Sequence, residues 1–387
     1  MVSAVGKGSI CGWEPILYTG YLIRIPVKTA SRPYDVLVAR GLLNRATQAL
    51  DGPLPQAARI FVVTSKPIRK HWGKALGKGL HGLNSKIRFI EMPDGERAKR
   101  LRELELLAEE LVEHGADRSS ILFALGGGVV GDVGGFLASI FMRGIPVVQV
   151  PTTLVAQVDS AIGGKTGVNL TSGKNLLGTF HQPICVLIDP DVLSTLPRRE
   201  YHSGLFEAMK YGVIRNLQIF ETMEQRRDDL VKRHPELLEW LIAECIRVKA
   251  DVVSSDEREA GERRILNFGH TIGHALEAET GYKKLLHGEA VGWGMIAAAR
   301  IGEEVGTTDA ETAQRIRVLV SAYGPLPGVE VKPKRILKRL MSDKKTVGGV
   351  PHFVLATRIG EVQIVNDVPE RAMVRAVEEL NDLSARQ

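Results

Sequence analysis

The chain has few cysteines and few aromatic residues, and it lacks any long hydrophobic run. Cys11, Cys185 and Cys245 are far apart and form no CxxC pair, which argues against a disulfide framework and a thiolate zinc site. The first twenty residues lack the apolar run of a signal peptide, and no segment approaches the ~18 apolar residues of a membrane span. We therefore expect no membrane association and a reducing, cytoplasmic location.

No block of like charge stands out, although the net charge is +6. Lys and Arg are spread along the chain and often alternate with acids, as in residues 95–115. This pattern argues against nucleic-acid binding, which needs a basic stripe or patch, and favours small anionic ligands. The length of 387 residues is enough for two domains of ordinary size with a sizeable core.

Short β-rich runs alternate with helical patterns in the first half of the chain. Buried strands are predicted at residues 59–65, 87–93, 121–125, 145–151 and 184–190. Between the second and third of these, an amphipathic helix is predicted to end at Gly115, with one apolar face formed by Leu101, Leu104, Leu107 and Leu111. The repetition predicts a mostly parallel sheet covered by helices, with ligands at the carboxyl ends of the strands.

The pattern becomes mainly helical from about residue 192. A long helix is predicted to begin near Pro235, and the small residues of 288–306 predict a closely packing helix. A late strand pair is expected to turn near Gly360. We predict an α/β, Rossmann-like domain at residues 1–191 and a mainly α-helical domain at residues 192–387.

A glycine-rich segment follows the predicted strand at 121–125. Gly126, Gly128 and Gly131 have the GxGxxG spacing, which lets the backbone approach a pyrophosphate at the start of a helix. The next strand ends in PTT instead of the acid usual in dinucleotide units. A tight turn packed by glycine is therefore the alternative to phosphate contact.

A second glycine-rich segment contains GGKT at 163–166. It is not a P-loop, because Asp159 stands where that pattern needs a glycine. Lys165, Lys174 and Asn175 bring cationic and amide groups close to it in sequence, which suits a phosphorylated substrate.

Glu207 and Lys210 are three residues apart and should share one face of a short helix. Taken alone, this spacing favours an ordinary surface ion pair. Such a pair contributes little to stability.

The densest group of polar side chains lies in residues 256–289. His270 and His274 are four apart, hence on one helix face, and His287 follows in another apolar helix. The pattern is not the HExxH of zinc proteases, because no glutamate lies between the first two histidines. A catalytic zinc typically takes three protein ligands, so two of these histidines and a carboxylate would suffice. The alternative is a set of buried, hydrogen-bonded histidines.

Taken together, these segments resemble the 3-dehydroquinate synthases, which belong to the sugar-phosphate cyclases. The resemblance runs in one order from about residue 60 to 360 and is carried by residues 93–99, 124–132, 143–169, 173–183, 204–212, 256–277, 286–295 and 343–345. It implies an NAD-binding α/β domain, a helical metal-binding domain, an active site in the cleft between them, and a homodimer.

The resemblance also implies roles for single residues. The zinc ligands that it implies are Glu207, His270 and His287, and Co²⁺ is an alternative metal. The residues that it places around NAD are Glu96, Lys99, Gly126, Gly127, Gly128, Val129, Asp132, Thr152, Thr153, Asp159, Lys165 and Lys174. The residues that it places around the substrate are Asp159, Lys165, Asn175, Lys210, Lys249, Arg263, Asn267, His274 and Lys344. It also implies that Arg143 reaches the phosphate across the dimer interface.

The implied activity is that of a carbon–oxygen lyase of the shikimate pathway, which leads to aromatic amino acids. It converts 3-deoxy-D-arabino-heptulosonate 7-phosphate, a keto-acid phosphate, to 3-dehydroquinate and phosphate. A substrate hydroxyl is transiently oxidised by NAD, phosphate is eliminated with the substrate phosphate itself as base, and the ketone is reduced back. The ring then opens and closes by an intramolecular aldol step, so NAD shows no net turnover. Zinc would polarise the hydroxyl and then the ketone, while cations such as Arg263 hold the anionic groups.

The chain departs from the family pattern after the predicted strand at 59–65. Members of the family usually have an Asp or Asn after this strand, which contacts the ribose of the NAD adenosine. This chain has Ser65 and Pro67 in that region. Phe180 and Phe206 also differ, and we expect these two to change packing only.

Three other functions share some of these features. Another NAD- and zinc-dependent cyclase, such as an amino-dehydroquinate synthase, would change the groups that bind the substrate anions, but Arg263, Asn267 and His274 have the dehydroquinate-synthase form. A metal-dependent polyol dehydrogenase would not need the cations. A non-catalytic NAD-binding module would not need a full set of ligands.

Overall fold

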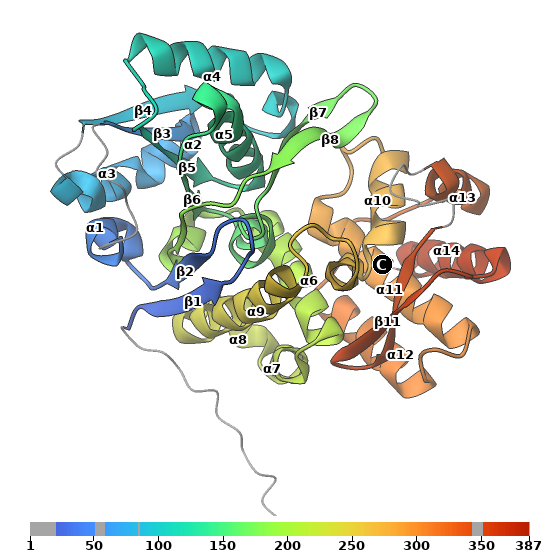
Figure 1. Ribbon diagram of the computed structural model, residues 1–387. Coiled ribbons are helices and arrows are strands. Elements are labelled where there is room, and N and C mark those ends of the chain that lie inside the picture. Colours follow the sequence, from blue (N-terminus) through green and yellow to red (C-terminus); the bar gives the residue numbers. More distant parts are fainter. Residues whose placement is uncertain (1–20, 51–58, 84–85, 343–350, 387) are drawn as a thin grey trace, which may run out of the picture.

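A computed structural model describes residues 21–50, 59–83, 86–342 and 351–386. A mainly parallel sheet covered by helices forms the N-terminal half, and helices dominate the C-terminal half (Figure 1). The predicted fold class is therefore confirmed. No helix among the described residues is both long and apolar enough to cross a membrane.

The sheet has seven strands. Their order is β1 (Ile23–Val27), β2 (Tyr34–Val38), β9 (Cys185–Ile188), β6 (Val147–Pro151), β5 (Ile121–Gly126), β3 (Arg59–Ser65) and β4 (Lys86–Met92). Only β1 and β2 pair antiparallel within it. The five predicted strands are β3, β4, β5, β6 and β9, whereas the β1–β2 pair was not predicted.

The chain changes direction across the sheet between β3 and β5. The chain leaving β3 runs to β4 on one side, and the chain leaving β5 runs to β6 on the other. Ligands of open α/β sheets bind beyond the carboxyl ends of strands at such a switch point. The ends that meet there are Ser65 and Gly126.

Both faces of the sheet are buried. Ile60 and Val62 of β3 belong to one hydrophobic cluster and Phe61 and Val63 to the other, as the period of two requires. This burial explains why the strands are continuous apolar runs.

The second cluster is covered by α4 (Leu101–Glu113) and α5 (Gly128–Ile140). The predicted apolar face of α4 is confirmed except at Leu101, which is exposed because it is the first residue of the helix. Gly115 follows the helix with a φ of 71°, as expected of a stop residue.

The remaining helices are α1 (Ala46–Ala49), α2 (Lys66–Ile68), α3 (Lys74–Leu80), α6 (Arg198–Ile214), α7 (Leu217–Gln225), α8 (Arg227–Val231), α9 (Pro235–Ser255), α10 (His270–Glu279), α11 (His287–Glu304), α12 (Ala310–Ala322), α13 (Pro333–Ser342) and α14 (Glu370–Ala385). Helix α9 begins at Pro235, as predicted, and packs against β1. One hydrophobic cluster therefore continues from the sheet into the helical half. The boundary between residues 191 and 192 stays a prediction.

Two further strand pairs stand apart from the sheet. Strands β10 (Phe353–Arg358) and β11 (Glu361–Val365) form the predicted hairpin, with Gly360 at a φ of 89°. Strands β7 (Lys165–Leu170) and β8 (Gly173–Phe180) form a second hairpin, which projects from the N-terminal half toward α10 (Figure 1). This hairpin was expected to be a glycine-rich loop, because the mostly exposed residues of β8 give no apolar alternation.

Candidate active site

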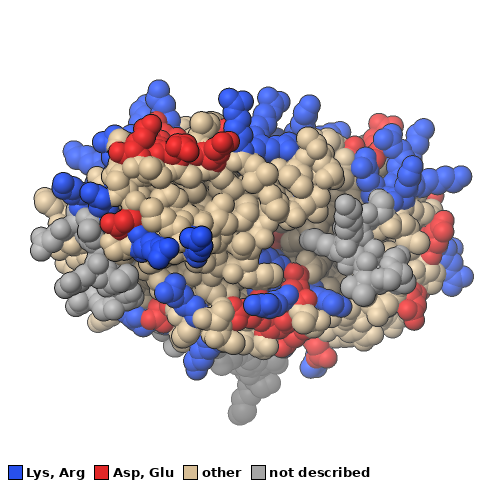
Figure 2. Space-filling view, turned by 45° about the horizontal axis from the view of Figure 1, so that its top comes forward, with Lys and Arg blue, Asp and Glu red and all other residues tan. Residues whose placement is uncertain are grey.

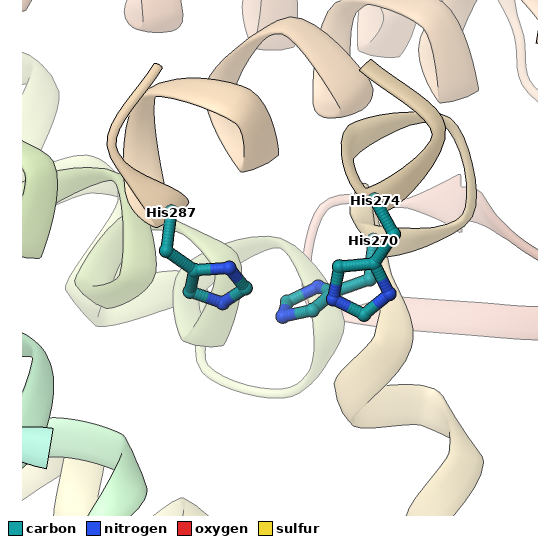
Figure 3. Close-up of side chains that lie close together, drawn as sticks. All are labelled: His270, His274 and His287. Carbon is teal, nitrogen blue, oxygen red and sulfur yellow. The ribbon is translucent and has the colours of Figure 1, made fainter. Parts of the chain in front are cut away.

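Side chains from three helices meet at the predicted metal centre. Glu207 lies in the middle of α6, while His270 and His287 are the first residues of α10 and α11. The histidine rings point toward one another (Figure 3). The Nε2 atoms of His270 and His287 are 3.5 Å and 3.2 Å from the same oxygen, Oε1 of Glu207.

Each of these histidines has its other ring nitrogen occupied. Nδ1 of His270 lies 3.0 Å from the carbonyl oxygen of Phe268, and Nδ1 of His287 lies 3.2 Å from Oε2 of Glu277. Because both oxygens can only accept, both Nδ1 atoms carry a proton, and Nε2 is the atom of each ring that a metal ion would use.

The buried carboxylate of Glu207 completes a donor set that fits zinc. Its Oε2 is paired with Nζ of Lys210, while its Oε1 faces the Nε2 atoms of both histidines, the position in which a metal ion would be shared. Two imidazole nitrogens and one carboxylate are a typical catalytic zinc set. The residues present therefore fit a divalent metal ion.

The carboxylates strongly favour positive charge at this centre. Burial lowers the pKa of His287, but the hydrogen bonds to Glu207 and Glu277 outweigh burial and raise it to about 10. Burial lowers the pKa of His270 to about 4. A metal ion therefore competes with a proton for Nε2 of His287, and metal binding weakens in acid.

His274 lies at the same centre. Its ring centroid is 5.3 Å from that of His270 and 5.7 Å from that of His287, and one nitrogen from each ring lies within 4.8 Å of the others. A set of three histidines is thus a second geometrical option for a metal. The division of His270 and His274 into ligand and substrate contact stays a prediction.

Glu207 and Lys210 do not form the surface ion pair that their spacing alone favours. Both are buried, with 0% and 1% of their side chains exposed, and Nζ of Lys210 is 2.7 Å from Oε2 of Glu207. The spacing could not reveal this burial, because α6 is surrounded by other elements on nearly all sides.

Asp159 joins this pair to a second lysine. Its Oδ1 is 3.5 Å from Nζ of Lys210 and 2.8 Å from Nζ of Lys249, and it accepts a 2.5 Å hydrogen bond from Tyr211. Lys249 also donates to the backbone oxygen of Asp159 at 2.6 Å. Three of the predicted substrate residues, Asp159, Lys210 and Lys249, therefore lie together beside the metal centre.

The charges of this cluster are shifted by burial and by one another. Burial alone would raise the pKa of Asp159, but Lys210 and Lys249 hold it well below its usual range. Burial lowers the pKa of Lys249 to about 8. Asp159 and Glu207 outweigh burial at Lys210 and raise its pKa. Lys249 is therefore the first of the two lysines to lose its charge in alkali.

Two further predicted substrate residues, Lys165 and Asn267, contact Glu259. This residue pairs with Lys165 and accepts a 2.9 Å hydrogen bond from Nδ2 of Asn267. The buried Arg263 donates to the backbone oxygens of Glu257 and Gly163, the latter at 3.1 Å, and its Nε has no partner among the described residues. The face drawn in Figure 2 is hollowed between the two halves, with acidic and basic side chains at the edge of the hollow.

The predicted nucleotide turn joins β5 to α5. A Cβ at Gly126 would lie 2.5 Å from Val130, one at Gly127 2.9 Å from Thr153, and one at Gly128 3.1 Å from Ser160. None of them has a positive φ, so close packing is what disfavours a larger residue here, most strongly at Gly126. The turn is thus tightly packed around its glycines, as the alternative interpretation expected. Such a turn can also contact a phosphate.

Buried hydroxyl groups gather at the ends of the neighbouring strands. Ser65 ends β3, Thr152 follows β6, and Ser160 faces Gly128. None of their hydroxyls has a hydrogen-bond partner among the described residues. Buried hydroxyls without partners are uncommon and suit a polar ligand. With the start of α5 available to a pyrophosphate, the residues present fit NAD.

The remaining cofactor residues form a network on the N-terminal half. Lys99 pairs with Asp132 and donates to Oδ1 of Asn175, whose φ is 54°. Glu96 accepts a 2.7 Å hydrogen bond from Asn169. Asn175, predicted for the substrate, thus lies among residues predicted for NAD.

Lys174, predicted for NAD, reaches in the other direction. Its Nζ is 3.1 Å from Oε1 of Glu277 and 4.4 Å from the centre of the Tyr282 ring. Glu277 was not assigned a role. Its position seven residues after His270, two turns along the same helix face, is a signal that could have found it. For Tyr211, Glu259 and Ser160 the sequence offers no comparable signal.

The remaining predicted residues make few contacts with the groups described above. Arg143 is exposed, with a φ of 70°, and has no ion-pair partner in the part of the chain that the structure describes. Val129 is half-buried in the first turn of α5, and the hydroxyl of Thr153 accepts from the amide of Ala156. Lys344 lies outside the described residues.

Comparison with known proteins identifies relatives along most of the chain. The family model of the 3-dehydroquinate synthase N-terminal region matches residues 89–203, and that of the 3-dehydroquinate synthase C-terminal region matches residues 204–346. A 3-dehydroquinate synthase from Koribacter versatilis is 58% identical over 361 residues, which are 93% of this chain and 99% of the relative.

Two solved structures are similar in fold and hold cofactors. A 2-deoxy-scyllo-inosose synthase complexed with carbaglucose-6-phosphate, NAD⁺ and Co²⁺ has a TM-score of 0.82 at 26% identity, covering 92% of this chain and 99% of the other. A 2-epi-5-epi-valiolone synthase from Streptomyces hygroscopicus subsp. jinggangensis, with NAD⁺ and Zn²⁺ bound, has a TM-score of 0.82 at 28% identity and covers 99% of both chains.

Proposed function

The chain belongs to the 3-dehydroquinate synthase family, and we propose which of its residues carry out the reaction of that family. The enzyme converts 3-deoxy-D-arabino-heptulosonate 7-phosphate to 3-dehydroquinate and phosphate, with NAD and a divalent metal ion as cofactors. When bound, NAD supplies an acceptor and then a donor of hydride, and the metal supplies a Lewis acid at the substrate oxygen atoms.

Glu207, His270 and His287 would hold the metal ion. The support is that both Nε2 atoms lie close to one oxygen of Glu207, while each Nδ1 is fixed by an acceptor. His274, one turn along α10 from His270, would face the substrate.

The observation that carries the proposal is the contact between the metal site and the cationic cluster. Lys210 lies between Glu207 and Asp159, and Asp159 in turn holds Lys249. A substrate oxygen at the metal would therefore lie near the ammonium group of Lys210, which Asp159 links to that of Lys249. These groups, with Arg263, Lys165 and Asn267, would hold the carboxylate and phosphate of the substrate.

The glycine turn and the buried hydroxyls would hold NAD. The amides at the start of α5 would meet the pyrophosphate, and Thr152 and Ser160 would supply hydroxyl groups beside it. Ser65, which replaces the Asp or Asn usual in the family, ends β3 at the switch point and offers a hydroxyl where a ribose would lie.

We further propose that the site is completed by a second copy of the chain. Arg143 follows Ile140 and Met142, which are exposed, and exposed Phe180 lies next to Thr179, whose hydroxyl donates to Ser139 at 2.8 Å. A second copy covering these apolar side chains would bury them and bring Arg143 to the substrate phosphate in its partner.

Subunit complementation tests this dimer. Arg143→Ala and His270→Ala should each be nearly inactive alone, because each lacks one component of every site. A mixture that exchanges subunits should regain activity, since the intact metal site of one chain then receives Arg143 from the other. If the mixed dimers are inactive, the proposal that Arg143 of one subunit contributes to the site of the other is wrong.

The reaction itself is tested with the purified protein, zinc, a catalytic amount of NAD and the heptulosonate phosphate. Release of inorganic phosphate together with dehydroquinate, without accumulation of NADH, is expected. Stoichiometric NADH would instead indicate a polyol dehydrogenase, and preferential turnover of an aminated substrate would indicate an amino-dehydroquinate synthase. We place the enzyme in the shikimate pathway in a reducing, cytoplasmic compartment, which agrees with the free, buried thiols of Cys185 and Cys245.

A further inference from the structure

Glu277 contacts groups from both sides of the cleft, and the proposed reaction does not use it. Only 4% of the residue is exposed. Its Oε2 accepts from Nδ1 of His287 at 3.2 Å, and its Oε1 accepts from Nζ of Lys174 at 3.1 Å. One carboxylate thus connects a metal ligand on α11 with the β7–β8 hairpin.

Lys174 is held at this position by a second contact. Its Nζ lies 4.4 Å from the ring centre of Tyr282, a favourable cation–π arrangement. Tyr282 has a φ of 57°, a conformation that residues other than glycine rarely adopt, and its amide donates to the carbonyl oxygen of Glu277 at 2.8 Å. The strained residue therefore lies directly beside the helix end that carries Glu277.

The hairpin directs neighbouring residues to opposite sides. Asn175, with a φ of 54°, turns its side chain to Lys99 on the N-terminal half, whereas Lys174 crosses to α10. The pairing of β7 with β8 shifts register between Val168 and Leu170, close to this point. The local backbone is thus built to contact both halves of the cleft.

We propose that Glu277 is a positioning residue for His287 and that Lys174 holds Glu277 in place from across the cleft. A carboxylate on the outer nitrogen of a ligating histidine fixes the ring orientation and tautomer and raises the basicity of the ligand. The position of the hairpin and the affinity for the metal are then coupled. This inference rests on the proposed role of His287 as a metal ligand.

The test of Glu277 measures metal binding rather than turnover. We expect Glu277→Gln to weaken Zn²⁺ binding about 10- to 100-fold, as measured by competition with a chromophoric chelator. It should also change the visible spectrum of the Co²⁺-loaded protein. Glu277→Asp, which keeps the charge on a shorter side chain, should recover part of the affinity.

The matched control is Glu279→Gln on the same helix. Glu279 is also largely buried, but it pairs with Arg335 and Arg339 of α13 instead of a histidine. Its replacement removes the same charge and should leave Zn²⁺ affinity and the Co²⁺ spectrum unchanged. Equal losses in both variants would mean that only net charge matters and would overturn the positioning role.

Lys174→Met tests the contact across the cleft and is measured without NAD. We expect weaker Zn²⁺ binding in the single variant and no further loss when Lys174→Met is added to Glu277→Gln, because the two side chains act through one path. Independent, additive losses would overturn the coupling. So would an effect of Lys174→Met on NAD affinity alone.

His287→Ala separates this inference from the proposed function. If His287→Ala loses the metal while Glu277→Gln binds Zn²⁺ as tightly as the unmodified protein, the ligand assignment stands and the positioning role is wrong. If His287→Ala keeps the metal, the ligand assignment is wrong and the inference falls with it.

Discussion

The two sides of the cleft satisfy their buried polar groups in different ways. On the metal side, His270, His287 and Lys249 each have a defined protein partner. On the nucleotide side, the hydroxyls of Thr152 and Ser160 have none among the described residues. The metal side is therefore organised by the protein itself, whereas the nucleotide side presents groups that a ligand can satisfy. Substitutions of the paired groups on the first side should disturb the protein and its metal, and substitutions of these two hydroxyls on the second should change mainly the affinity for NAD.

The largest expected effect is on the metal centre. His270→Ala should weaken metal binding by more than about a hundredfold and remove turnover, since it deletes a direct ligand. His274→Ala should keep the metal and lose turnover. Metal content after dialysis and phosphate release distinguish the two, and equal loss of metal in both variants would favour the set of three histidines.

A stability loss should follow from Asp159→Asn. Lys210 and Lys249 would then be buried without the carboxylate that they share, which costs about 3–5 kcal/mol for a broken buried pair. Denaturant unfolding of the protein at a fixed metal concentration measures this loss. An unchanged midpoint would show that water or Glu207 replaces the lost charge, and the contrast between the two sides would weaken.

The pH dependence should reflect Lys249. Its pKa of about 8 lies below that of a free lysine, so the ammonium form that binds an anion is present below this pH and lost above it. We expect kcat/KM to fall about tenfold between about pH 7 and about pH 9. In Lys249→Arg, whose guanidinium stays charged, the alkaline fall should disappear even if overall activity is lower. Its persistence would assign the fall to another group.

The smallest expected effect lies on the nucleotide side. Thr152→Val removes a buried hydroxyl that has no protein partner, so folding stability should stay the same or rise slightly. Affinity for NAD should fall by about threefold to tenfold, the value of one hydrogen bond. Titration of NAD into the variant, beside a thermal melt, checks both parts, and a lower melting temperature would contradict the contrast.

Much of the fold follows from local patterns, because buried parallel strands are continuous apolar runs. Residues 59–65 become β3 without a change of boundary. The β7–β8 hairpin could not be predicted in the same way, since residues such as Leu176 and Leu177 are exposed and its neighbours are distant in sequence. The prediction that Leu101 is buried was wrong for a related reason. Periodicity identifies the apolar face of a helix but not how far along the helix that face is covered.

The site was predictable where a motif is local and unpredictable where partners are distant. His270 and His274 are recognisable from spacing, and the glycine turn from its place after a strand. Glu207 could not be distinguished from a surface residue without the resemblance to a family, because burial comes from elements far along the chain. The partners of Lys174 and Asn175 depend on a shift of strand register and on the left-handed backbone at Asn175, and no sequence pattern predicts either of them.

The glycine turn between β5 and α5 has a practical consequence for variant screening. A methyl group at Gly126 would overlap Val130, and one at Gly127 would press on Thr153. Alleles at these positions would therefore lower the amount of folded protein before they altered its use of NAD. In a growth-based screen they would look like cofactor-binding defects, and only soluble yield measured beside activity would reveal a packing fault.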